Sequence, residues 1–120
     1  MPIVDIELIG SSEIPIDLPQ LMADAIGRML EAPPGTTWVR ARFLPASLYA
    51  ESGGELPSDV EPVFVTILQR RRPTGAGLAG AVAAVTEAVA EITGRASEHV
   101  HIVFEEDGAG RVAFGGEIVL

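Results

Sequence analysis

A proline directly follows the first methionine, in a position where it could do chemistry. Pro2 opens the alternating run Ile3-Val4-Asp5-Ile6-Glu7-Leu8, a pattern typical of a β-strand. Removal of Met1 would leave Pro2 with a free secondary amine at the start of that strand. An apolar, arginine-lined pocket would disfavour the protonated amine through desolvation and like charge, and both effects lower its pKa toward neutrality. Pro2 is therefore a candidate general base.

The cationic residues provide the second chemical signal. All eight are arginine, in a chain of net charge −9. Arg70, Arg71 and Arg72 are consecutive at the end of a predicted strand, and Arg40 and Arg42 share one face of another strand through its period of two. Such a run is often a solvated turn, but at a strand end it favours an anion site. A planar guanidinium presents paired donors to a carboxylate or an enolate.

Composition limits the class of protein. With 120 residues, 48% of them hydrophobic and 5% aromatic, the chain suits one domain with an aliphatic core. Its acidity argues against binding to nucleic acid or acidic lipid, and the lack of cysteine excludes disulfides and thiolate metal sites. No signal-peptide pattern opens the chain, so we expect a cytoplasmic enzyme or binding protein. Glu87 and Glu91 interrupt the apolar stretch 76–92, and we expect no membrane span.

The chain contains an internal repeat with a period close to half its length. The first half is predicted as the strand Pro2–Leu8, the helix Asp17–Glu31, the strand Trp38–Leu44 and a Gly53-Gly54 pair. The second half repeats this order with the strand Pro62–Leu68, a helix from about Thr74 to Gly94, the strand His99–Glu105 and a Gly115-Gly116 pair. One unit of this size could not bury its sheet alone. We predict a single domain, 1–120, with repeats at about 1–54 and 62–116 and a linker at 55–61.

This element order predicts an α+β fold. Each strand-helix-strand unit implies a parallel strand pair with a right-handed crossover. Two units related by a pseudo-twofold axis make a four-stranded sheet with both helices on one face. The other face stays uncovered and carries alternating apolar residues, so we expect a homo-oligomer with packed sheets. The Gly-Gly tails would be short hairpins or edge strands that reach a neighbour.

Together these features resemble the tautomerase superfamily, whose βαβ units carry a catalytic amino-terminal proline. The chain looks most like two 4-oxalocrotonate tautomerase-like units fused head to tail. The resemblance covers essentially the whole chain and rests on Pro2-Ile3, Ala32-Pro33, Val39-Arg40, Pro62, Arg72, the strand at 100–106 and Gly115-Gly116-Glu117. It implies a homotrimer that binds a small carboxylate substrate and needs no cofactor.

The resemblance also implies roles for individual residues. Pro2 corresponds to the catalytic proline. Arg40 matches the strand arginine that holds the substrate's keto oxygen and adjoining carboxylate. Arg72, aided by Arg70 or Arg71, resembles the arginine that grips a carboxylate after the first strand of a unit.

The sequence departs from the family pattern at three positions, and these departures make the two halves different. Ser12 stands where the first half would carry the carboxylate-gripping arginine, and His101 replaces the strand arginine of the second half. Pro62 lies inside the chain, so its nitrogen is an amide and cannot act as a base. Each half therefore keeps one of the two arginines, and we expect one active proline site per subunit.

Four further residues are candidates for a pocket wall or a metal site. Tyr49 or Phe114 could supply an aromatic wall of the pocket, and Tyr49 could donate its hydroxyl to a developing enolate. Both are equally compatible with ordinary core or interface aromatics. His99 and His101, two apart in the predicted strand, would share a face and could ligate a metal. No third ligand is evident, and we predict no metal site.

Three functions fit these residues. The first is a cofactor-independent tautomerase, an isomerase in which Pro2 moves a proton within a 2-hydroxydienoate or 2-oxo acid. The second is a dehalogenase, hydratase or decarboxylase of the 3-haloacrylate or malonate semialdehyde type, in which protonated Pro2 is an acid and Glu106 activates water. The third is a non-catalytic oligomer that binds a small carboxylate, with Pro2 only opening a strand.

Overall fold

The computed structural model describes residues 1–10 and 14–120 and contains every predicted helix and long strand. The first half forms β1 (Ile3–Gly10), α1 (Leu18–Met29), β2 (Trp38–Pro45) and the short turn η1 (Ala46–Leu48). The second half forms β3 (Val63–Leu68), α2 (Gly75–Thr93), the turn η2 (Ser97–His99), β4 (Val100–Phe104) and a hairpin of β5 (Ala113–Phe114) and β6 (Glu117–Ile118). The elements thus occur in the predicted order.

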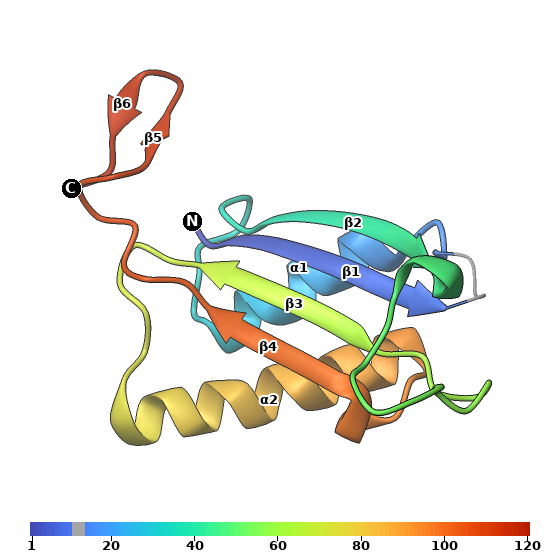
Figure 1. Ribbon diagram of the computed structural model, residues 1–120. Coiled ribbons are helices and arrows are strands. Elements are labelled where there is room, and N and C mark those ends of the chain that lie inside the picture. The colour runs from blue at the N-terminus through green and yellow to red at the C-terminus, as the bar shows by residue number, and fades with distance from the viewer. Residues whose placement is uncertain (11–13) are drawn as a thin grey trace.

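The four long strands form one mixed sheet in the order β2-β1-β3-β4. Within each half the two strands are parallel, whereas β1 and β3 are antiparallel at the centre. Both helices cover the same face of this sheet (Figure 1), which confirms the predicted α+β fold. Because β1 and β3 run in opposite directions, Ile3 at the start of β1 pairs with Leu68 at the end of β3. This register brings the amino terminus to the segment that follows β3.

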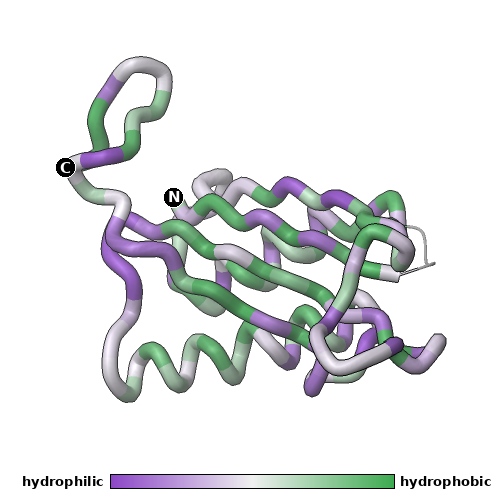
Figure 2. The backbone as a smooth tube through the Cα atoms, viewed as in Figure 1, coloured by the Kyte–Doolittle hydropathy of each residue, from purple (hydrophilic) through white to green (hydrophobic). Residues whose placement is uncertain are grey.

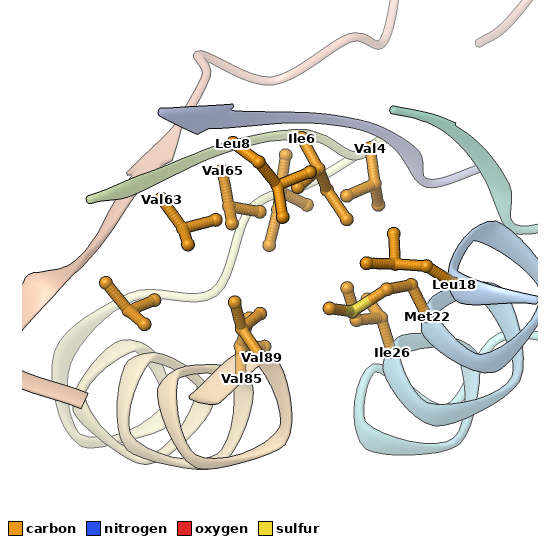
Figure 3. Close-up of a cluster of buried hydrophobic side chains, with 12 residues drawn as sticks. Val4, Ile6, Leu8, Leu18, Met22, Ile26, Val63, Val65, Val85 and Val89 are labelled. Atoms are coloured by element: carbon orange, nitrogen blue, oxygen red, sulfur yellow. The ribbon is translucent and has the colours of Figure 1, made fainter. Parts of the chain in front are cut away.

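The core lies between the sheet and the helices and is entirely aliphatic (Figure 3). Alternate residues of β1 and β3 point toward the helices, as the period of two requires. Fully or almost fully buried members are Val4, Ile6, Leu8, Leu18, Met22, Ile26, Val63, Val65, Ile67, Val85 and Val89. Burial of each such side chain contributes about 1.5–3 kcal/mol. This core fixes the strand register on which the site geometry depends.

The second face of the sheet is open in the single chain, as predicted. Hydrophobic and hydrophilic residues alternate along its strands (Figure 2). Two ion pairs cross from β1 to β2 on this face: Arg40 Nε lies 2.7 Å from Asp5 Oδ1, and Arg42 Nε lies 3.2 Å from Glu7 Oε2. The open face therefore also carries charged pairs on β1 and β2, which the sequence prediction of apolar residues on this face did not include.

The second Gly-Gly pair forms a short hairpin, as predicted, whereas the first lies in a turn outside the named strands. Gly115 and Gly116, with φ of 57° and 92°, connect β5 to β6 in a backbone region that only glycine enters freely. The hairpin projects beyond the sheet in Figure 1. Gly53-Gly54 lies in a turn closed by a bridge between Glu51 and Gly54.

Two details differ from the sequence prediction. His99 ends η2, before β4 begins at Val100, so the argument that places His99 and His101 on one strand face is wrong. By length and composition alone, α2 is long and apolar enough to cross a membrane, with a hydropathy of 1.4. Glu87 and Glu91 do not lower the mean hydropathy of α2 below the level typical of a helix that could cross a membrane. Its buried residues include Val85 and Val89, which belong to the core cluster.

Candidate functional site

Pro2 is buried at the end of the sheet where β3 and β4 finish (Figure 1). Its carbonyl oxygen accepts a hydrogen bond of 3.0 Å from the main-chain nitrogen of Trp38. A proline at this position lacks a strand donor, which is tolerated because it precedes the first paired residue, Ile3. The antiparallel register of β1 and β3, continued by one residue, places Pro2 opposite Gln69.

The arginine cluster follows β3 directly and therefore lies at the same end of the sheet. The main-chain nitrogen of Arg72 donates to Asp107 Oδ1 at 2.8 Å, and Arg72 Nε lies 3.8 Å from Glu106 Oε2. Arg71 Nη1 lies 3.7 Å from Asp107 Oδ2. The side-chain pairs are long and partly exposed, so they are worth little. An incoming carboxylate can therefore compete for these arginines.

The remaining arginine of this cluster is held by the end of the chain. Arg70 Nε donates to the main-chain oxygen of Leu120. Two hydrophilic segments, one after β3 and one after β4, run together at this end in Figure 2. Ala109 donates from its main-chain nitrogen to the carbonyl of Arg70 at 3.1 Å. Backbone hydrogen bonds thus hold the arginine segment against the segment that follows β4.

The segment after β4 also covers the amino terminus. Gly108 is buried, and its main-chain nitrogen donates to the carbonyl of Gln69 at 2.8 Å. The methyl group of Met1 lies so close to Gly108 that a Cβ atom there would collide with it. Burial lowers the pKa of the Met1 amino group. This end of the molecule therefore disfavours a cation at the chain terminus, the environment expected for a proline base.

Arg40 lies near the same end but on the open face of the sheet. It forms two hydrogen bonds to Asp5, Nε to Oδ1 at 2.7 Å and Nη2 to Oδ2 at 2.9 Å. The hydrogen bonds to Asp5, together with its negative charge, raise the pKa of Arg40. A cavity of about 310 Å³ on this face is lined by Ile3, Asp5, Arg40, Thr66, Leu68, Glu105 and Arg111.

The two aromatic candidates lie at different ends of the sheet. Phe114 contacts Trp38 edge to face, with ring centroids 4.7 Å apart, near the Pro2 end. Tyr49 donates its hydroxyl to Glu51 Oε2 at 2.7 Å and lines a cavity of about 560 Å³ at the far end of β1. Burial, reinforced by Glu51, raises the pKa of Tyr49 to about 12. Within one chain, the structure brings Phe114 but not Tyr49 toward Pro2.

Three polar residues were not singled out by the sequence prediction. Arg95, whose side chain is 6% exposed, lies at the end of the sheet opposite Pro2, and Arg111 lines the open-face cavity. Gln69 has a buried side-chain oxygen without a hydrogen-bond partner among the described residues. Only the strand register could have indicated Gln69, because it places this residue opposite Pro2. Ser12, predicted at the first-half arginine position, lies outside the described residues.

Comparison with known proteins shows what the chain is similar to. A family model described as "Tautomerase enzyme" matches residues 64–119. This segment of the chain is therefore similar to the tautomerase family. The match covers the second repeat, which carries the arginine cluster and the Gly115-Gly116 hairpin. No curated protein matches the chain.

Solved structures with the tautomerase fold resemble the whole chain. A fused 4-OT asymmetric trimer is 16% identical, with a TM-score of 0.74 over 95% of this chain and 94% of that one. Pt0534 inactivated by 2-oxo-3-pentynoate is 19% identical, with a TM-score of 0.76 over 97% and 94%. A malonate semialdehyde decarboxylase inhibited by 3-bromopropiolate is 21% identical, with a TM-score of 0.71 over 94% and 88%. At these identities the likeness establishes the fold, and neighbours with different reactions share it.

Proposed function

We propose that this protein is a member of the tautomerase superfamily and, once Met1 is removed, a cofactor-independent isomerase that uses Pro2 as a general base. Its substrate class is a 2-hydroxydienoate or 2-oxo acid. The observation that carries the proposal is the β1–β3 register, which brings buried Pro2 and the Arg70–Arg72 cluster to one end of the sheet. Burial lowers the pKa of the Met1 amino group at this end of the sheet, and the same environment would favour the neutral form of a freed Pro2 amine.

In this reaction the neutral Pro2 nitrogen takes a proton from the enol oxygen or α-carbon of the substrate. The electron pair left behind spreads over the dienolate, and Pro2 then returns the proton to another carbon of the same molecule. Arg72, with Arg70 or Arg71, binds the remote carboxylate. Arg40 stabilises negative charge on the substrate oxygen in the transition state.

Arg40 can fill that role only where another surface meets the open face of the sheet. We propose a homotrimer, in which packed sheets bring Arg40 to a site that includes Pro2. The open, charged face and the trimeric fused 4-OT among the structural neighbours support this assembly. The ion pair with Asp5 holds the Arg40 guanidinium in place. A bound substrate would share this guanidinium with the Asp5 carboxylate.

A second candidate reaction uses Pro2 as an acid. Glu106 and Asp107 lie among the arginines at the Pro2 end, and a malonate semialdehyde decarboxylase is among the structural neighbours. In this alternative, protonated Pro2 would donate a proton during hydration, dehalogenation or decarboxylation, and Glu106 would activate water.

The deciding experiment compares Met1-free wild-type protein with Pro2→Ala, after mass spectrometry has verified loss of Met1. Turnover of enolised phenylpyruvate or 2-hydroxymuconate should fall at least about a hundredfold in the variant, the usual scale for loss of a general base. Circular dichroism establishes that both proteins are folded. An unchanged rate would refute the proposed base.

The same proteins separate the three functions. Chloride release from 3-chloroacrylate, with a rate that depends on a protonated group, would favour the acid mechanism over the base mechanism. Carboxylate binding without turnover in either assay would favour a non-catalytic binding oligomer.

A further inference from the structure

Gln69 carries an unsatisfied polar atom close to the chain terminus. Its side-chain oxygen Oε1 is buried and has no hydrogen-bond partner among the described residues. A buried amide oxygen without a donor is unfavourable, and such atoms are rare in native structures. Gln69 follows the last residue of β3 and its main-chain carbonyl is satisfied by Gly108. The unsatisfied acceptor of Gln69 is therefore its side-chain oxygen and not its main-chain oxygen.

Strand register places this side chain beside Pro2. The pairs Ile3–Leu68 and Val4–Ile67 are consecutive in the antiparallel β1–β3 ladder, and the next step outward sets Pro2 against Gln69. Residues directly opposite in such a ladder have Cβ atoms about 4.5–5.5 Å apart. Pro2 also shares the face of Val4, and Gln69 shares that of Ile67, because side chains alternate along a strand. Val4 and Ile67 both belong to the core face.

Processing of the chain would create the missing donor. While Met1 is attached, the Pro2 nitrogen is a tertiary amide and carries no hydrogen. Removal of Met1 converts it to a secondary amine, with one N–H when neutral and two when protonated. Met1 also vacates the space beside Gly108, which directly adjoins the carbonyl of Gln69. A donor then arises next to the buried acceptor.

We propose that the Gln69 side-chain oxygen accepts a hydrogen bond from the freed Pro2 nitrogen and acts as its positioning residue. This inference rests on the proposed role of Pro2. When the neutral amine gives its single hydrogen to Gln69, its lone pair points away from Gln69 toward the space that Met1 occupied. The proton-accepting orbital is thereby aimed where a substrate can enter.

The same hydrogen bond sets the protonation of Pro2. An acceptor stabilises the ammonium more than the neutral amine, so Gln69 raises the pKa of Pro2 relative to an apolar residue at the same position. This increase opposes the effect of desolvation, which lowers the pKa of Pro2. Gln69 therefore adjusts the balance between the base and acid forms of the site.

Charged residues also lie on the segments that surround this end of the sheet. They are Asp5, Arg40, Arg70, Arg71, Arg72, Glu105, Glu106, Asp107 and Arg111. Among them, Arg71 and Arg72 pair with Asp107 and Glu106, and Arg40 pairs with Asp5. Replacement of Gln69 by leucine changes none of these charges. A shift in the titration of Pro2 in that variant therefore reports the lost acceptor.

The test is an NMR titration of ¹⁵N-labelled Pro2 in the Met1-free protein. In Gln69→Leu, which keeps a side chain of similar size, the pKa of Pro2 should fall by about one pH unit, the scale of a hydrogen bond to a charged group. In Gln69→Glu it should rise, because the carboxylate favours the ammonium. The matched control is Gln20→Leu on α1, whose exposed side chain donates to Asp24 Oδ1, and this variant should leave the titration unchanged.

The readouts separate this inference from the proposed function. The limb of the kcat/KM pH profile that reports Pro2 should move in the same direction as its NMR titration. An unmoved Pro2 pKa in both Gln69 variants overturns the role of Gln69, even if Pro2→Ala abolishes turnover. Conversely, activity retained in Pro2→Ala overturns the proposed base, while the NMR titration still decides whether Gln69 binds the amine.

Discussion

Replacement of Arg95 by methionine should destabilise the fold more than any other single change to an arginine. Arg95 Nη1 donates to the carbonyl oxygens of Ile9, Glu61 and Pro62, at 2.5, 3.2 and 3.1 Å. Its Nη2 lies 3.1 Å from Glu61 Oε2, and its side chain is 6% exposed. One guanidinium thus joins the end of β1, the start of β3 and the segment after α2.

The size of the effect follows from this burial. Desolvation lowers the pKa of Arg95, and the negative charge of Glu61 opposes that shift. Removal of one partner of a buried ion pair typically costs about 3–5 kcal/mol. Because the Glu61 side chain is 23% exposed, water can replace part of the lost contact. We therefore expect a loss of about 3 kcal/mol in Arg95→Met, which keeps most of the apolar stem.

The measurement is urea unfolding followed by circular dichroism, at one fixed protein concentration because association adds to apparent stability. With an m-value of about 2 kcal/mol/M, the midpoint should fall by about 1.5 M. The matched control is Arg28→Met, at an exposed position in the last turn of α1, which should change stability by less than about 0.5 kcal/mol. If Arg95→Met lost no more unfolding free energy than Arg28→Met, the proposal that Arg95 stabilises the fold by joining these three segments would be refuted.

Two further predictions concern the two ends of the sheet. Gly108→Ala should destabilise the Met1-containing protein by about 1–3 kcal/mol and the Met1-free protein less, because the new Cβ would collide with the Met1 methyl. Equal melting-temperature losses in both forms would contradict this packing. Absorbance titration of Tyr49 should give a midpoint at about pH 12, partly lowered in Glu51→Gln. Since its folded pKa is raised above about 10, its contribution to stability is complete below pH 10 and is lost between about pH 10 and 12.

The fold could be predicted from the sequence because local patterns and long-range pairing agree. Val4, Ile6 and Leu8 alternate in the sequence and are buried in the structure. Gly94 ends α2 with a φ of 71°, as a helix-stopping glycine should. The repeat then requires parallel strands in each half, and the sheet follows once the two halves share one core.

The placement of Tyr49 shows how topology limits a site prediction. β1 and β2 are parallel, so residues after the end of β2 lie at the end of the sheet away from Pro2. The predicted topology already implied this separation within one chain. Only a second chain could bring Tyr49 to a Pro2 site, and the residue types of a single sequence do not specify how chains associate.

The cross-strand neighbours of Arg40 and Gln69 depend on register, which residue types alone do not give. Asp5 and Arg40 are 35 positions apart but directly paired across β1 and β2. A shift by one residue would move either side chain to the other face. The sequence predicts that Arg40 binds an anion, whereas the register shows that the nearest anion is Asp5.

The two parts of the proposed site have different structural origins. The β1–β3 pairing of one chain brings Pro2, Gln69 and the arginine cluster together, so their arrangement requires only a folded subunit. Arg40 lies on the open face, and its role also requires that sheets pack against one another. On the proposed mechanism, the contact between Pro2 and Gln69 needs only the folded chain, whereas stabilisation of the enolate by Arg40 needs the assembly. A subunit that folds without associating should then keep the effect of Gln69 on the Pro2 pKa and lose the proposed contact of Arg40 with the substrate.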